Sequence, residues 1–110
     1  FTIADIDMYG MRFIMEKAIN IAGSGTSGYH VSFDMDVLNP TEAPGVGTPV
    51  YGGLTYREAH LASEMIAEDG RMVSLEMVEV NPILDNRNQT YEIAVSLVCS
   101  LLGKQIIHSD

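Results

Sequence analysis

Tyr-His-Val-Ser-Phe-Asp-Met, residues 29–35, is the stretch that decides the fold. It is short, rich in Val, Phe and Tyr, and follows a Gly- and Ser-rich segment at 23–28, a combination that predicts a β-strand after a turn. Residues 72–80 predict a second strand. Because this strand is apolar at most positions, we expect it to be covered on both faces.

Helices are predicted before, between and after these strands, over residues 2–22, 55–69 and 90–102. Two of the starts carry the spacing of a capping box, Thr2 with Asp5 and Thr55 with Glu58. Strands that alternate with helices predict the α/β class with a parallel sheet. Two strands alone leave both sheet edges bare, so the pattern indicates a piece of a larger α/β domain.

Residues 39–53 cannot form regular structure. The segment contains Pro40, Pro44 and Pro49 together with four glycines. Loops of this length inside compact domains are usually functional. We therefore expect part of a binding site here.

The composition limits the possible functions. The chain carries 15 Asp and Glu against 6 Lys and Arg, a net charge of -9, which argues against nucleic acid and is compatible with binding cations. No apolar run approaches the roughly 18–20 residues of a membrane span, and the opening residues show no sign of a secretory signal.

The single cysteine, Cys99, fits a reducing compartment and is expected to be a small core residue. A start at Phe1 is an expected sign of a fragment or a processed chain.

Asp34 and Asp36 are the first candidates for chemistry. Residues two apart in an extended chain point to the same side, so both carboxylates should leave the strand together. Such a pair repels itself unless a cation lies between, and hard oxygen ligands suit Mg, Ca or Mn. The spacing alone leaves a second possibility open, in which the two residues serve turn and helix-cap roles.

Glu79 is the second candidate, because it is predicted to lie within the covered strand. A buried carboxylate costs several kcal/mol unless it is paired or hydrogen-bonded. Its partner could be an arginine elsewhere in the protein or a cationic group on a substrate. Glu76, three residues earlier, should face the other side of the strand and is expected to be a supporting residue or a partner for a neighbouring helix. His30, His60 and His108 lack metal-ligand spacing and are expected to be ordinary polar residues.

Several motifs in a fixed order resemble the ureohydrolases, and arginases in particular. Residues 32–40, Ser-Phe-Asp-Met-Asp-Val-Leu-Asn-Pro, resemble the last metal-binding motif of that family, Ser-Phe-Asp-x-Asp-Gly-Leu-Asp-Pro. Residues 43–50 and 52–58 look like the loop and helix start that follow it. Residues 79–82, Glu-Val-Asn-Pro, are similar to the closing arginase motif; agmatinases usually carry another residue before the proline. The resemblance implies that residues 1–110 are the C-terminal segment of one three-layer αβα arginase-like domain, with the N-terminal part absent.

The resemblance also implies roles for individual residues. Asp34 should bridge two manganese ions, Asp36 should bind one of them, and Glu79 should hold the substrate guanidinium. Thr48 should line the substrate end of the pocket. The positions of Arg57 and Glu58 often take part in subunit contacts. No other catalytic residue is expected in this segment.

The activity implied is manganese-dependent hydrolysis of L-arginine to L-ornithine and urea, in a cytoplasmic homo-oligomer, a trimer or hexamer, with no nucleic acid or membrane partner. Sister ureohydrolases (agmatinase, guanidinobutyrase, formimidoylglutamase) and a non-catalytic assembly fragment are the alternatives. Val37 and Asn39 stand where the motif commonly has Gly and Asp. The family's earlier motifs, with His and Asp ligands and a His proton shuttle, have no match here, so the chain alone is expected to be inactive.

Overall fold

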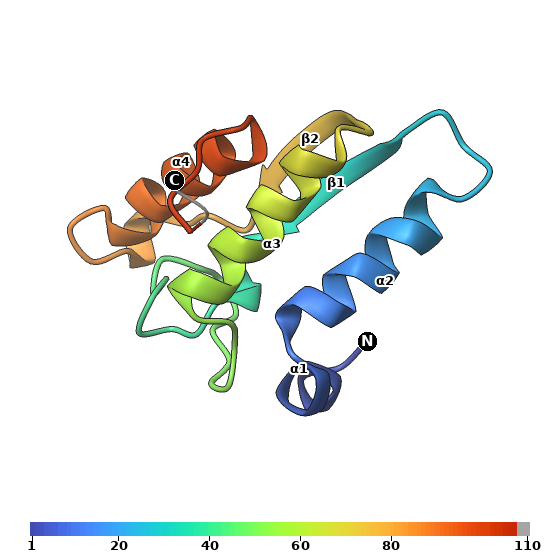
Figure 1. Ribbon diagram of the computed structural model, residues 1–110. Helices are drawn as coiled ribbons and strands as arrows, with labels where there is room; N and C mark the ends of the chain where they lie inside the picture. Colours follow the sequence, from blue (N-terminus) through green and yellow to red (C-terminus); the bar gives the residue numbers. More distant parts are fainter. Residues whose placement is uncertain (108–110) are drawn as a thin grey trace.

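The computed structural model describes residues 1–107 and contains four α-helices, two short 3-10 helices and two strands (Figure 1). His108 lies outside the described residues. In chain order the elements are α1 (Ile3–Tyr9), α2 (Met11–Gly23), β1 (Tyr29–Asp34), η1 (Met35–Val37), α3 (Tyr56–Asp69), β2 (Met72–Val78), η2 (Pro82–Leu84) and α4 (Gln89–Leu101). The predicted alternation of helices and strands in an α/β fold is confirmed.

The first predicted helix is in fact two helices that meet at Gly10. The expected capping box forms, because Thr2 and Asp5 bond each other's backbone N–H. The helix nevertheless stops at Gly10, whose φ of 85° belongs to a region that side-chain-bearing residues rarely adopt. The prediction of one helix over 2–22 was therefore wrong, since a glycine inside an apolar pattern acted here as a break.

The two strands pair in parallel over their whole length. Tyr29 faces Met72 at one end and Asp34 faces Val78 at the other, with one irregularity after Tyr29. The second strand ends at Val78 rather than at residue 80, because Glu79 has a φ of 65°, in the left-handed region and outside the extended range of a regular strand.

The third and fourth helices agree with the predictions to within one residue at each end. Thr55 and Glu58 form the expected capping box at the start of α3. Gly70 ends that helix in the left-handed conformation, with a φ of 76°. Gly103 follows α4 closely, as the pattern predicted.

All three long helices pack against the same face of the sheet. α3 lies between α2 and α4, and Ile19, Ile66 and Leu101, one from each helix, form a buried cluster with apolar residues of both strands (Figure 1). The other sheet face carries exposed residues, among them Val73 with 71% of its surface accessible. The expectation of a second strand covered on both faces is thus wrong within residues 1–107.

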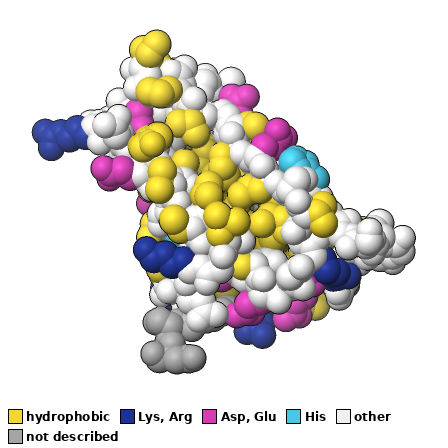
Figure 2. All heavy atoms as spheres, turned by 90° about the horizontal axis from the view of Figure 1, so that it is seen from above, with side chains coloured by type: hydrophobic (Ala, Val, Ile, Leu, Met, Phe, Trp, Pro, Cys, Tyr) yellow, Lys and Arg dark blue, Asp and Glu magenta, His cyan; other side chains and the backbone are white. Residues whose placement is uncertain are grey.

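Apolar side chains also remain on the outside. Figure 2, which looks down on α4 and β2, shows many of them gathered in one area with the charged residues around it. Cys99 is exposed on α4, so the expectation of a core cysteine was wrong as well. No helix within the described part of the chain has the length and apolar character needed to cross a membrane.

Candidate metal and substrate site

The predicted site residues gather where both strands end. Asp34 is the last residue of β1 and pairs with Val78, so Glu79 lies one residue beyond that pair. Neighbouring strands are about 4.8 Å apart, so both carboxylate-bearing segments lie at the same end of the sheet, where the strands reach their carboxyl ends. In open α/β sheets, ligands bind just beyond the carboxyl ends of the strands.

Asp34 shapes the turn that presents Asp36. One oxygen of the Asp34 carboxylate accepts a hydrogen bond from the Asp36 backbone N–H at 3.0 Å and caps η1. The cap role that the spacing left open is therefore real, and it uses only part of the carboxylate. Burial raises the pKa of Asp34; the backbone N–H of Asp36 lowers it, and the nearby Asp36 carboxylate raises it again.

The loop at 39–53 lies over the carboxyl ends of the strands and places Thr48 beside Asp36. The Thr48 hydroxyl donates to Asp36 Oδ2 at 3.0 Å. The adjacent Gly47 borders Glu79, whose Oε2 would lie 3.8 Å from a Cβ at that glycine. The structure thus brings Asp34, Asp36, Thr48 and Glu79 into one region.

The loop is fixed at several points, which explains how a segment without regular structure can position Thr48. Leu38 and Leu54 form a short bridge at its base, and both are buried. The Gly45 N–H donates to the buried Thr90 hydroxyl of α4 at 2.6 Å. The Asn81 N–H donates to the Gly45 carbonyl, also at 2.6 Å, so the segment after Glu79 is tied to the loop.

Glu79 is exposed, which corrects the prediction of a buried strand carboxylate. Within residues 1–107 it forms no ion pair with an arginine or lysine, so the internal partner considered from the sequence is not found there. Its carboxylate remains available to a cationic group.

Glu76 faces β1 rather than a helix. Its carboxylate lies 3.5 Å from His30 Nε2, and hydrogen bonds from Ser32 and then from His30 lower its pKa. His30 Nδ1 lies 2.7 Å from the Ser74 hydroxyl. This polar group occupies the uncovered face of the sheet, so Glu76 is not the partner of a neighbouring helix, one of the two roles expected for it.

The burial of His60 was not predicted from the sequence. It is fully buried between α3 and α4, with Nδ1 at 2.9 Å from the Ser100 hydroxyl and Nε2 at 3.3 Å from that of Ser96. Burial lowers its pKa, an effect opposed by Glu64. Glu64 is also buried and accepts hydrogen bonds from the backbone N–H groups of Ile106 and Ile107. The positions of His60 and Glu64 in the sequence did not indicate which residues they would contact.

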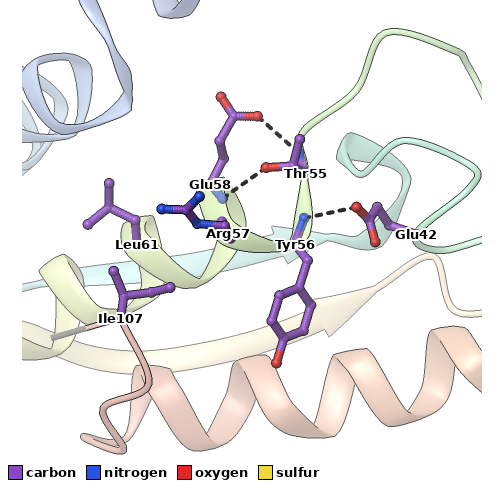
Figure 3. Close-up of a pocket in the computed structure, with 7 residues that line it drawn as sticks. All are labelled: Glu42, Thr55, Tyr56, Arg57, Glu58, Leu61 and Ile107. Carbon is purple, nitrogen blue, oxygen red and sulfur yellow. Dashed lines mark hydrogen bonds between the residues drawn. The ribbon is translucent and has the colours of Figure 1, made fainter. Parts of the chain in front are cut away.

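A separate hollow of about 430 Å³ lies at the start of α3 (Figure 3). Arg57 and the apolar side chains Leu61 and Ile107 line it, and none of the four predicted site residues does. Glu58 uses one oxygen to accept from the Thr55 N–H in the capping box (Figure 3). Arg57 is exposed and forms no ion pair with any other described residue.

The donors at the strand ends fit a hard divalent cation in type but not in number. Asp34 and Asp36 supply carboxylate oxygens, the ligands that Mn²⁺ accepts readily. No group of three or more His, Cys, Asp or Glu side chains in the described residues is arranged to hold a metal ion. Two carboxylates can therefore form only part of a metal centre.

Comparison with known proteins agrees with this arrangement. The sequence profile described as the Arginase family matches residues 1–103. The arginases of Bacillus caldovelox and Bacillus subtilis are 52% and 50% identical to the chain over 97% of its length and 36% of theirs. The chain thus spans about a third of the relatives that it matches.

Solved structures give the same result. The arginase from Bacillus caldovelox superposes with a TM-score of 0.93 at 52% identity, covering 97% of this chain and 36% of that one. The formimidoylglutamase from Bacillus subtilis superposes with a TM-score of 0.87 at 30% identity, covering 93% and 32%. With a family profile over nearly its whole length and close relatives in sequence and fold, this chain belongs to the arginase family.

Proposed function

We propose that this chain is part of an enzyme that hydrolyses L-arginine to L-ornithine and urea with two manganese ions. The observation that carries the proposal is the pair Asp34 and Asp36 at the end of a parallel strand, in a member of the arginase family. Asp34 would bridge the two ions and Asp36 would bind one of them. Bound there, the metal centre would supply a water molecule with a lowered pKa as the nucleophile.

The other residues would position the ligand and the substrate. Thr48 holds Asp36 through its hydroxyl and would line the substrate pocket. Glu79 would bind the substrate guanidinium, because a carboxylate and a guanidinium form paired, charge-assisted hydrogen bonds. Its exposure and its freedom from ion pairs among the described residues leave it open to that partner. Fixing the guanidinium orients its carbon toward the nucleophile.

We propose further that residues 1–110 are a C-terminal segment of one domain and are inactive without the remainder. Two carboxylates are too few for a tight dinuclear centre. The complete enzyme would be a cytoplasmic homo-oligomer, a trimer or hexamer, in which Arg57 and Glu58 contact another subunit. The guanidinium of Arg57, which is exposed and forms no ion pair among the described residues, is consistent with that role.

The test is a chimera in which this chain replaces the matched portion of the Bacillus caldovelox arginase. Manganese binding is measured by titration calorimetry, and urea release is measured with L-arginine. Asp34→Asn should weaken manganese binding at least tenfold, because a bridging carboxylate is lost. The matched control, Asp7→Asn, changes an exposed aspartate on α1 and should leave binding unchanged. Equal binding by the Asp34→Asn variant and the parent would refute the metal role.

A sister ureohydrolase is the second candidate, favoured by the structural match to a formimidoylglutamase. The Asn81-Pro82 pair argues against agmatinase. Comparing L-arginine with agmatine, guanidinobutyrate and formiminoglutamate in the same chimera decides between them. A faster rate on any of the last three would replace arginine as the substrate. A non-catalytic assembly fragment would release no urea from the three guanidino compounds and no formamide from formiminoglutamate.

A further inference from the structure

Glu79 has a backbone conformation that a glutamate does not favour. Its φ of 65° lies in the left-handed region, which residues with a Cβ rarely adopt. The side chain is exposed and forms no ion pair with the described residues, so it does not itself stabilise this conformation. A conformation of this kind persists where the surrounding structure fixes it. The residues that fix the backbone at position 79 therefore set the direction of its carboxylate.

The segment after Glu79 is held through a single loop residue, Gly45. The N–H of Asn81, two residues beyond Glu79, donates to the Gly45 carbonyl at 2.6 Å. The N–H of Gly45 in turn donates to the hydroxyl oxygen of Thr90, which is fully buried in the first turn of α4. One chain of hydrogen bonds thus runs from α4 through the loop to the backbone beside Glu79.

Asp85 orients the hydroxyl at the start of this chain. The Thr90 hydroxyl is hydrogen-bonded to the Asp85 carboxylate, so the proton points that way and the oxygen is left to accept from Gly45. The same carboxylate accepts from the backbone N–H groups of Asn86, Thr90 and Tyr91 at 2.9, 3.0 and 3.2 Å. Burial acts to raise the pKa of Asp85, but these hydrogen bonds lower it overall. Asp85 is therefore a fixed, charged acceptor.

The loop fits closely against the start of α4 (Figure 1). Gly45 is buried, and a Cβ there would lie 2.5 Å from Cγ of Asp85, far closer than an ordinary contact. Gln89, the first residue of α4, donates from its side chain to the carbonyls of Thr41 and Glu42 at 2.8 and 2.9 Å. The helix start thus holds the loop at two places, and only the contact with Gly45 continues toward Glu79.

We propose that Thr90 and Asp85 are positioning residues for the substrate site, which act by fixing Gly45. Gly45 holds the segment after Glu79 and so keeps the Glu79 carboxylate at the end of the sheet. Thr90 and Asp85 act through the backbone and not by contact with the substrate. The inference rests on the proposed function for one point, that the ligand of Glu79 is a guanidinium.

The metal ligands have a separate support. Asp34 and Asp36 lie on β1 and η1, and the Asp36 N–H donates to the Asp34 carboxylate. Thr48 is bonded to Asp36 as well as being carried by the loop. Loss of the Thr90 hydroxyl should therefore weaken the grip on the guanidinium and leave manganese binding intact.

The test uses the chimera with the rest of the Bacillus caldovelox arginase. Thr90→Val keeps the shape of the side chain but leaves the buried Gly45 N–H without its acceptor. KM for L-arginine should rise about tenfold, the worth of one charge-assisted hydrogen bond to the guanidinium. The Kd for manganese, measured by titration calorimetry, should stay within about twofold. Thr90→Ser retains the hydroxyl and should restore the parent KM.

Ser100→Ala is the matched control. Ser100 is also fully buried on α4, and its hydroxyl lies 2.9 Å from His60 Nδ1, away from the loop. This variant should lower Tm as Thr90→Val does and leave KM unchanged. Asp85→Asn provides a second, milder variant if Thr90→Val does not fold, and should raise KM about threefold.

Hydrogen exchange of residues 79–84 gives a readout that needs no activity. Thr90→Val should speed exchange of the Asn81 N–H about tenfold, whereas Ser100→Ala should not. Equal KM and equal exchange in Thr90→Val and the parent would overturn the positioning role, as would an equal rise in KM for Ser100→Ala. An inactive chimera that shows the faster exchange refutes only the proposed function, and an active chimera without it refutes only the positioning role.

Discussion

Replacing Glu79 by glycine should stabilise this chain, although it removes a residue proposed to bind substrate. Glu79 has a φ of 65° directly after β2, where the chain turns toward Asn81-Pro82. Its side chain is exposed and forms no ion pair with the described residues, so little contact energy is lost with it. The backbone conformation of residue 79 therefore decides whether the substitution raises or lowers the free energy of unfolding.

The expected gain follows from two opposing contributions. A side-chain-bearing residue in the left-handed region costs about 1–2 kcal/mol relative to glycine. Glycine costs about 0.5–1 kcal/mol in additional freedom of the unfolded chain. The free energy of unfolding should therefore rise by about 0.5–1 kcal/mol, which corresponds to a factor of about two to five in the folding equilibrium.

Urea unfolding of the chain, followed by far-UV circular dichroism, measures this change. Glu76→Gly is the matched control, because it makes the same substitution three residues earlier, inside β2. There glycine gains no relief of strain and loses the contacts to His30 and Ser32, so the midpoint should fall. A midpoint that falls for Glu79→Gly as it does for Glu76→Gly would refute the argument from backbone strain.

Four further substitutions test other parts of the structure. Tyr29→Phe removes the 2.7 Å hydrogen bond from the tyrosine hydroxyl to Asp69 and should lower the free energy of unfolding by about 1 kcal/mol, measured by urea titration. Burial lowers the pKa of His60 below its ordinary 6.5, so the unfolded chain takes up that proton first. Stability should therefore fall as the pH drops below about 6.5, and His60→Gln should remove that part of the decrease in unfolding curves recorded from pH 8 to 5. Gly53→Ala would place a Cβ 2.5 Å from a backbone oxygen and should cost about 1–3 kcal/mol in thermal unfolding. At Gly52, where a Cβ meets nothing within 4 Å but φ is 84°, alanine should cost about 1 kcal/mol.

Local signals predicted most of the elements. The capping boxes at Thr2 and Thr55 depend on residues three apart, and both form as predicted. Asp34 could be placed at a strand end because strand geometry is also local, but Asp36 lies in the 3-10 helix η1 and not in the extended chain from which its direction was predicted. The shared location of these residues and Glu79 followed from the rule that parallel strands end at one edge, and the register places them there.

The errors concern conformations and partners that local patterns do not encode. Gly10 fits an apolar helical period, and only its φ of 85° shows that the helix ends there. Glu79 continues an apolar run, yet its backbone leaves the strand conformation. Cys99 and β2 were expected to be covered because their sequences are apolar. Residues 1–107 do not include segments that cover these surfaces.

The register of the two strands has a consequence for the order of folding. Tyr29 and Met72, which begin the pairing, are 43 positions apart in the chain. Closing a loop of that length costs about 3 kcal/mol of chain entropy before any strand contact forms. The caps of α3 close short loops, whereas its contacts with α4 join His60 to Ser96 and Ser100, which are 36 and 40 positions away in the chain. α3 should therefore form early, and its packing on α4 should form late, together with the end of the sheet that carries Asp34.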